Sequence, residues 1–285
     1  MNASAMHSPH EAETEARRIV FRTKGQRQGP ITRLVSPSDL GQLLKPFVFL
    51  DYGVIPSPGG KLFGIHPHSG IATLTVPLTG GFEYFDTTGK AGRVPARGLE
   101  WMKAGSGAWH DGSIYSEDPL EFFQLWLALP EDWELTPAES QYVERSEVQS
   151  VGPVRVLLGH YEGASSTIKA PVGINYFHVE LADGEVWRFK PPVGHTVGWL
   201  AVNAGSALLP ELASTGELVV LDSSDGVIEI EAHGSTSLVV GTAVPHPYPL
   251  VTGYYSVHTN SDALERGELE IARIGEELRA AGRLR

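Results

Sequence analysis

The sequence contains no cysteine, which excludes disulfide bonds, thiolate metal sites and cysteine nucleophiles. Any metal site must therefore use imidazole or oxygen ligands. Basic residues are also few, with 22 lysines and arginines against 34 aspartates and glutamates, so the formal net charge is -12. Because nonspecific binding to a phosphate backbone depends on positive charge, this balance disfavours direct nucleic acid binding.

Long hydrophobic runs are missing as well. No stretch reaches the roughly 18 to 20 apolar residues that a membrane-spanning helix needs. The N-terminal segment MNASAMHSPHEAETEARR also lacks the apolar core of a signal peptide. We therefore expect no membrane association and a cytoplasmic location. Hydrophobic residues still make up 41% of the 285, which is typical of a folded chain with room for two domains.

Short apolar runs separated by Gly, Pro, Asp and Ser clusters dominate the chain, a pattern typical of antiparallel β structure. The first series extends from Ile31 to about Trp133, and an acidic connector, PEDWELTPAESQ, follows it. A second series then begins with VGPVRVLLG and ends near STSLVVGTA. Because helical periodicity is almost absent from both series, we predict an all-β protein built from two consecutive sandwiches or barrels.

The C-terminal segment SDALERGELEIARIGEELRAAGRLR differs from the rest of the chain. Its apolar residues share one stripe of an α-helix, and Asp262 stands three residues before Glu265 as in a capping box. The residues of the stripe are Leu264, Ile271, Ile274 and Leu278. We predict a terminal helix that packs on the sheets, and a partner-binding helix is the alternative.

Two histidines one residue apart precede an alternating run in FGIHPHSGIATLTVPL. Side chains alternate between the faces of a strand, so an unbroken strand would point His66 and His68 to the same interior as Leu74 and Val76. A bulge at Gly70 would break this register. Buried imidazoles need partners for their ring nitrogens, and His-x-His alone leaves metal binding and simple hydrogen bonding equally open.

A third histidine, His110, follows a strand and a glycine-rich turn in GLEWMKAGSGAWHDG. The order of HPHSG, GLEWMKAGSGAWH and QLWLALP, together with PFVFLDYG upstream, resembles the N-terminal cupin domain of the pirin family. The resemblance extends more loosely to GYYSVHTNSDALERGELE near the C-terminus. It implies two cupin-type antiparallel β-barrels, a bicupin, followed by the C-terminal α-helix.

The resemblance also implies one divalent metal, Fe(II), in the N-terminal domain, with His66, His68 and His110 as ligands. The predicted parts of the chain are a flexible tail (1–17), an N-terminal cupin domain with the metal site (18–135), a C-terminal cupin domain without metal (136–260) and the helix (261–285). The six histidines after position 150 show no ligand spacing and are interpreted as surface or hydrogen-bonded residues. No serine lies in a nucleophile-elbow pattern, so a hydrolase triad is not predicted.

The family carries a glutamate ligand two residues after the third histidine, but this chain has Gly112 there. A second family glutamate corresponds to Ala72. The candidates to replace the missing carboxylate, as ligand or as catalytic base, are Glu100 and Asp111. Without a carboxylate, three neutral imidazoles leave the metal its full charge and more open positions.

We expect an aromatic substrate pocket beside the metal, lined by Phe63, Trp101 and Trp109, with Trp126 as a further candidate and core packing as the alternative for each. The resemblance implies a metal-dependent dioxygenase that acts on flavonol-like, quercetin-type substrates. The alternative is a non-catalytic metal- or redox-sensing regulatory protein. The predicted partner is accordingly either a small aromatic molecule or a protein.

Overall fold

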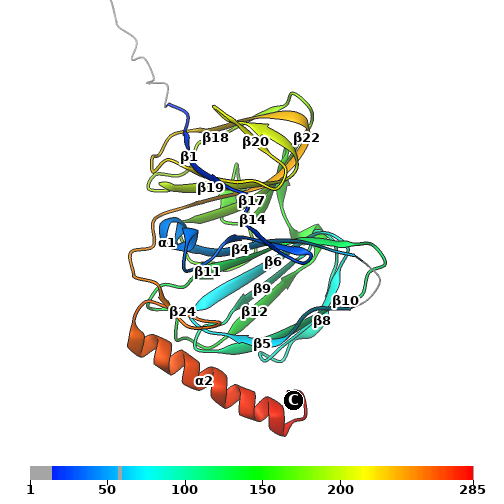
Figure 1. The fold of residues 1–285 in the computed structure, drawn as a ribbon, viewed down its shortest axis with the longest axis vertical. Helices are drawn as coiled ribbons and strands as arrows, with labels where there is room; N and C mark the ends of the chain where they lie inside the picture. The colour runs from blue at the N-terminus through cyan, green and yellow to red at the C-terminus, as the bar shows by residue number, and fades with distance from the viewer. Residues whose placement is uncertain (1–14, 57–59, 285) are drawn as a thin grey trace, which may run out of the picture.

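The computed structural model describes residues 15–56 and 60–284, in which two β-rich halves are stacked and a long helix lies along the free side of the first half (Figure 1). The all-β class and the C-terminal helix are confirmed. The helices described are α1 (Leu40–Leu44), the 3-10 helix η1 (Arg145–Glu147) and α2 (Ser261–Ala280). Of the predicted flexible tail, residues 1–14 lie outside the described residues, and no described helix has the length and apolar character to cross a membrane.

The first half consists of two facing sheets, of seven and four strands in the described part of the chain. The order of the larger sheet is β12 (Glu139–Val143), β9 (Leu99–Lys103), β6 (Ile71–Thr79), β11 (Leu120–Ala128), β4 (Phe47–Ile55), β3 (Ile31–Val35) and β2 (Gln26–Gln28). The order of the smaller sheet is β5 (Gly60–His68), β10 (Ala108–Ile114), β7 (Phe82–Asp86) and β8 (Ala91–Val94). His66, His68 and His110 therefore come from two neighbouring strands of the smaller sheet.

The second half is a curled sheet of nine described strands around an apolar core that includes Phe177, Trp187 and Leu200. Its main path is β1 (Ile19–Thr23), β21 (Leu218–Leu221), β19 (Val197–Leu208), β22 (Ile228–Ala243), β17 (Ile174–Leu181), β14 (Val154–Leu158) and β13 (Ser150–Val151). The remaining strands are β18 (Val186–Phe189) on β22, β20 (Leu212–Ser214) on β19, and two short pairs, β15 (His160–Tyr161) with β16 (Ala164–Ser165) and β23 (Val251–Thr252) with β24 (Val257–His258).

The N-terminal end of the described chain belongs to the second half. Strand β1 pairs with β21, although the sequence placed these residues with the first half. Arg17, which the sequence placed in the tail, is buried and donates to the carbonyl oxygens of Thr196 and Asp222. The predicted boundaries stay a prediction, and the pairing adds that the described part of the chain begins in the second half and then forms the first half.

The seven-stranded sheet has a different environment on each face. Leu74 and Trp101 point to a core shared with the second half, where they are joined by Tyr176 and Trp199. Within this core the rings of Phe47 and Trp199 meet edge to face, with centroids 5.3 Å apart. The opposite face, toward the four-stranded sheet, is mixed: polar residues such as Thr75 and Gln124 lie there beside aromatic ones such as Phe122 and Trp126.

The chain changes sheet between the two histidines and the apolar run. Strand β5 ends at His68, and β6 begins in the other sheet at Ile71. Between them Gly70 has φ +71°, and a Cβ there would lie 2.1 Å from the carbonyl oxygen of Val257, so only glycine fits. The interpretation of one unbroken strand was therefore wrong, and the alternative of a break at Gly70 is what the structure shows. Leu74 faces the second half, whereas Thr75 lies on the histidine side.

Helix α2 packs closely on the first half because glycines lie on its buried face. Asn260 caps its N-terminus by accepting a hydrogen bond from the Ala263 backbone, so the predicted capping box at Asp262 was wrong. The buried residues are Ala263, Gly267, Ile271, Gly275 and Leu278. Of the predicted stripe, Ile271 and Leu278 are buried, and Leu264 and Ile274 are half-buried.

Candidate metal centre

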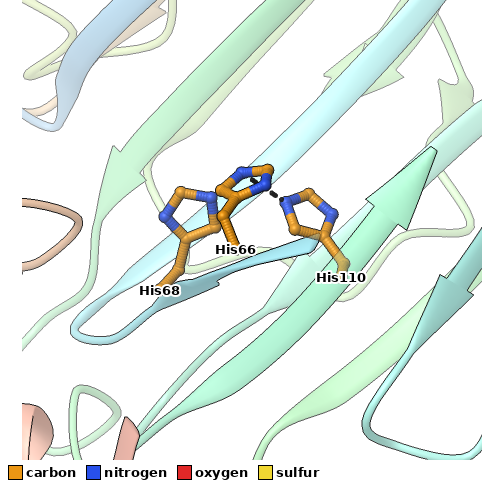
Figure 2. Close-up of side chains that lie close together, drawn as sticks. All are labelled: His66, His68 and His110. Atoms are coloured by element: carbon orange, nitrogen blue, oxygen red, sulfur yellow. Dashed lines mark hydrogen bonds between the residues drawn. The ribbon is translucent and has the colours of Figure 1, made fainter. Parts of the chain in front are cut away.

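The three histidines lie together because β5 and β10 pair in register. His110 is directly opposite His66, and Ala108 is opposite His68. One ring nitrogen from each histidine lies within 4.8 Å of the others, and the rings converge from the two strands (Figure 2). His68 and His110 are fully buried, and His66 is half-buried at the opening.

The outer nitrogen of each ring has an acceptor that fixes its tautomer. The Nδ1 atom of His66 lies 2.8 Å from the Gly64 carbonyl oxygen, and that of His68 lies 3.0 Å from the Tyr255 carbonyl oxygen. The Nδ1 atom of His110 lies 3.4 Å from Glu100 Oε1. Since these acceptors require a proton on Nδ1, every Nε2 presents a lone pair toward the shared point.

These lone pairs fit a metal ion. The Nε2 atoms of His66 and His110 are 3.1 Å apart, and with both Nδ1 atoms protonated neither Nε2 can donate to the other. The two Nε2 lone pairs therefore repel each other, and a cation bound between them would remove this repulsion. Burial lowers the pKa of His66 to about 3, with a smaller contribution from the neighbouring His110 ring, and burial lowers the pKa of His68 well below its usual value. Imidazole nitrogens that converge in this way suit a divalent metal ion.

A cavity of about 450 Å³ opens beside the histidines, within the size range of small-molecule sites. Phe49 and Trp126 stack in it with centroids 3.9 Å apart, and Trp126 meets the His68 ring edge to face at 4.7 Å. Arg33 covers Phe49 from the other side and pairs with Asp51. The lining residues are Gln28, Ile31, Arg33, Phe49, Asp51, Leu62, Phe63, His66, His68, His110, Phe122, Gln124, Trp126, Tyr254 and Tyr255.

Comparison with known proteins identifies the family. A family model described as Pirin matches residues 28–127. A Pseudomonas aeruginosa protein named "Putative quercetin 2,3-dioxygenase" is 30% identical over 244 residues, which are 79% of this chain and 84% of the relative. The chain belongs to the pirin family. Rat pirin is also 30% identical to this pirin-family chain, over 160 residues that make up 54% of each protein.

Solved structures share the fold of this pirin. A quercetin 2,3-dioxygenase from Acinetobacter baumannii superposes with a TM-score of 0.83 at 22% identity, covering 91% of this chain and 98% of its own. The Escherichia coli pirin YhhW, solved in complex with nickel(II), superposes with a TM-score of 0.62 at 20% identity, covering 77% of this chain and 94% of its own. The predicted bicupin architecture is confirmed.

This pirin has an aromatic ring beside the position where the family resemblance implies a carboxylate ligand. A Cβ built on Gly112 would lie 3.0 Å from Cζ of Phe63. The Phe63 ring is 4.7 Å from the His110 ring and 5.0 Å from the His66 ring, measured between centroids. Phe63 thus lines the cavity, as the sequence predicted, and leaves little space for a side chain at position 112.

Glu100 lies behind His110. It is fully buried on β9, where Oε1 faces His110 Nδ1 and Oε2 accepts a hydrogen bond of 2.6 Å from Thr75 Oγ1. This carboxylate is on the side of the ring away from the shared point, so it orients a ligand instead of becoming one. Its predicted role as a stand-in for the family ligand was therefore wrong in this geometry, and a role as base stays a prediction.

Asp111 points away from the three histidines. Strand alternation places it on the opposite face of β10 from His110, and its carboxylate lies 3.8 Å from Lys61 Nζ. It is absent from the described lining of the cavity. The structure therefore does not bring Asp111 into the site.

Two of the three predicted pocket aromatics lie elsewhere. Trp101 is buried in the core between the halves. Trp109 donates from Nε1 to the Ile271 carbonyl oxygen of α2 at 2.9 Å. The walls that sequence reasoning missed come from Phe49 and from Tyr255, which follows the second half. Trp126, the further candidate from the sequence, does line the cavity, on the same face of β11 as Gln124.

Proposed function

We propose that this protein is a metal-dependent dioxygenase that binds one divalent ion, Fe(II), through His66, His68 and His110 and acts on flavonol-like substrates. The observation that carries the proposal is the convergence of three histidine ring nitrogens at one side of an aromatic cavity. The name of the Pseudomonas aeruginosa relative supports the same substrate class. The predicted cytoplasmic location is part of this proposal.

When bound, the metal would supply Lewis acidity at a substrate oxygen and a redox-active centre for dioxygen. The residues of the chain would do the rest. The stacked pair of Phe49 and Trp126 offers a flat wall against which a fused aromatic ring system can lie. Apolar neighbours such as Phe63 and Phe122 exclude water from the substrate once it is seated.

A flavonol must lose a hydroxyl proton, and we assign the acceptor to Asp51. It is the carboxylate among the described lining residues of the cavity. Burial raises the pKa of Asp51, and the hydrogen bonds from Arg33 offset this only partly. A raised pKa makes a carboxylate a better base near neutral pH. Asp51 thus takes the role for which the sequence offered Glu100 and Asp111.

Metal analysis and oxygen uptake test this function. Purified wild-type protein should contain about one equivalent of metal and consume oxygen with a flavonol, whereas His110→Ala should lose most of the metal. Asp51→Asn should keep the metal and lose roughly 100-fold or more in turnover. Asp111→Asn is the matched control, since its carboxylate lies outside the cavity, and it should retain both. Unchanged metal content in His110→Ala would remove the proposed site.

A non-catalytic metal sensor is the second candidate. The observation in its favour is Phe63, which stands beside Gly112 where the family resemblance implies a carboxylate. Metal content without oxygen uptake on any flavonol would support the sensor and a protein partner.

A further inference from the structure

The segment Tyr254–Thr259 follows the second half of the chain but lies against the metal centre of the first half. The carbonyl oxygen of Tyr255 is the acceptor for His68 Nδ1 at 3.0 Å. Two residues later in the chain, the Val257 amide donates to the Ser69 carbonyl oxygen at 3.2 Å. Tyr254 and Tyr255 both line the cavity. The orientation of one candidate ligand therefore depends on a distant part of the sequence.

A buried chain of side chains holds this segment in place. His258 lies between Ser69 and Glu134, with Nε2 at 2.9 Å from Ser69 Oγ and Nδ1 at 2.9 Å from Glu134 Oε2. Glu134 also accepts hydrogen bonds from the backbone and the hydroxyl of Thr259, at 2.8 and 2.5 Å. Ser69, His258 and Glu134 are each at most 2% exposed. Such a fully satisfied buried network fixes the geometry of the segments that it joins.

The order serine, histidine, carboxylate matches that of a hydrolase triad, but helix α2 closes it off. A Cβ on Gly267 would lie 2.5 Å from both His258 Nε2 and Ser69 Oγ. The backbone of the helix therefore covers the hydroxyl where a substrate would have to enter. Ser69 is also absent from the lining of the cavity beside the three histidines. These contacts point to a structural link and not to a nucleophile.

We propose that Ser69, His258 and Glu134 form a latch that holds the Tyr255 carbonyl against His68 and so makes the C-terminal segment a positioning part of the metal centre. The latch joins the end of β5, the turn that follows β11 and the end of β24. A partner on the outer nitrogen of a metal-binding histidine fixes the ring and its tautomer, and its loss typically costs roughly 10- to 100-fold in affinity. The inference rests on the proposed function only in requiring a metal at the three histidines.

Glu134→Gln tests the latch. The carboxylate accepts three hydrogen bonds, and an amide replaces one accepting oxygen with a donor. We expect Co(II) affinity, measured by competition with a chelator, to fall roughly 10- to 100-fold. The absorption bands of the bound Co(II) should also shift, because His68 changes its orientation. Ser69→Ala, a smaller change, should lower the affinity in the same direction if Glu134→Gln fails to fold.

Glu121→Gln is the matched control. Glu121 accepts hydrogen bonds from Tyr52 and Asn203 and does not line the cavity. The Glu121→Gln variant should be less stable than wild type but should keep the wild-type Co(II) affinity and Co(II) spectrum. If the latch variants bind Co(II) as tightly as this control does, with an unchanged spectrum, the latch is overturned. Metal binding without flavonol turnover would overturn only the proposed enzyme, whereas wild-type protein that binds no Co(II) would overturn both.

Discussion

Gly112 and Phe63 together decide the charge of the metal centre. The three candidate ligands are imidazoles and bring no carboxylate, and burial keeps the pKa values of His66 and His68 low. Phe63 fills the space beside Gly112, where the family resemblance implies a carboxylate. A bound dication would therefore keep its charge and more open positions, and an anionic oxygen of a substrate would be a favourable further ligand.

The contact between Gly112 and Phe63 predicts that substitutions at these two positions have non-additive effects on metal affinity. Gly112→Glu alone should lower the unfolding temperature with little gain in metal affinity, because the new side chain meets the Phe63 ring at about the distance of a clash. Adding Phe63→Ala should release this conflict. Since opposite charges attract by several kcal/mol even at an effective dielectric constant of about 20, the double variant should bind metal at least about tenfold more tightly.

Chelator competition and thermal unfolding of the metal-free variants measure both effects, and Phe63→Ala alone is the control for lost packing. Equal affinities of Gly112→Glu and the double variant would show that Phe63 does not restrict this position.

Strand β6 shows what the sequence could and could not predict about the elements. Its alternation correctly indicated a strand with one apolar face. Which face turns inward was not predictable from this strand alone, because the partner of the apolar face is a sheet from the other half of the chain. Trp101 was misplaced for the same reason. His66 and His68 were found by their local spacing and His110 by the family resemblance, whereas Tyr255 and Glu134 approach them only through tertiary folding.

The two faces of β6 should therefore respond differently to mutation. Leu74→Ala removes a fully buried side chain from the shared core and should cost about 2–5 kcal/mol of unfolding free energy while leaving metal affinity unchanged. Thr75→Val keeps the shape but removes the hydrogen bond to Glu100, which orients His110. It should lower metal affinity by roughly tenfold. Urea unfolding and chelator competition separate the two effects, and an affinity loss in Leu74→Ala would contradict this division.

At the scale of the whole molecule, the two halves share one core and are tied by polar contacts. Arg97 of the first half forms an ion pair with Glu180 of the second, and its carbonyl oxygen accepts from Arg155. Arg155 in turn contacts His178, with 3.3 Å between Nη1 and Nδ1. His178 donates from Nε2 to Ser237 at 2.9 Å. These contacts require a neutral His178, because a proton on Nδ1 would face the guanidinium.

This requirement predicts how stability depends on pH. Burial and the charge of Arg155 lower the pKa of His178 in the folded protein, whereas the unfolded chain keeps a value near 6.5. Below about pH 6.5 the unfolded state therefore binds more protons, and the free energy of unfolding should fall by up to about 1.4 kcal/mol per pH unit from this residue.

His178→Gln should make the slope of unfolding free energy against pH shallower between pH 7 and 5. The exposed His233→Gln should leave it as in wild type. Urea midpoints of chelator-treated protein measure the slope, and an unchanged slope in His178→Gln would mean that another group senses the pH.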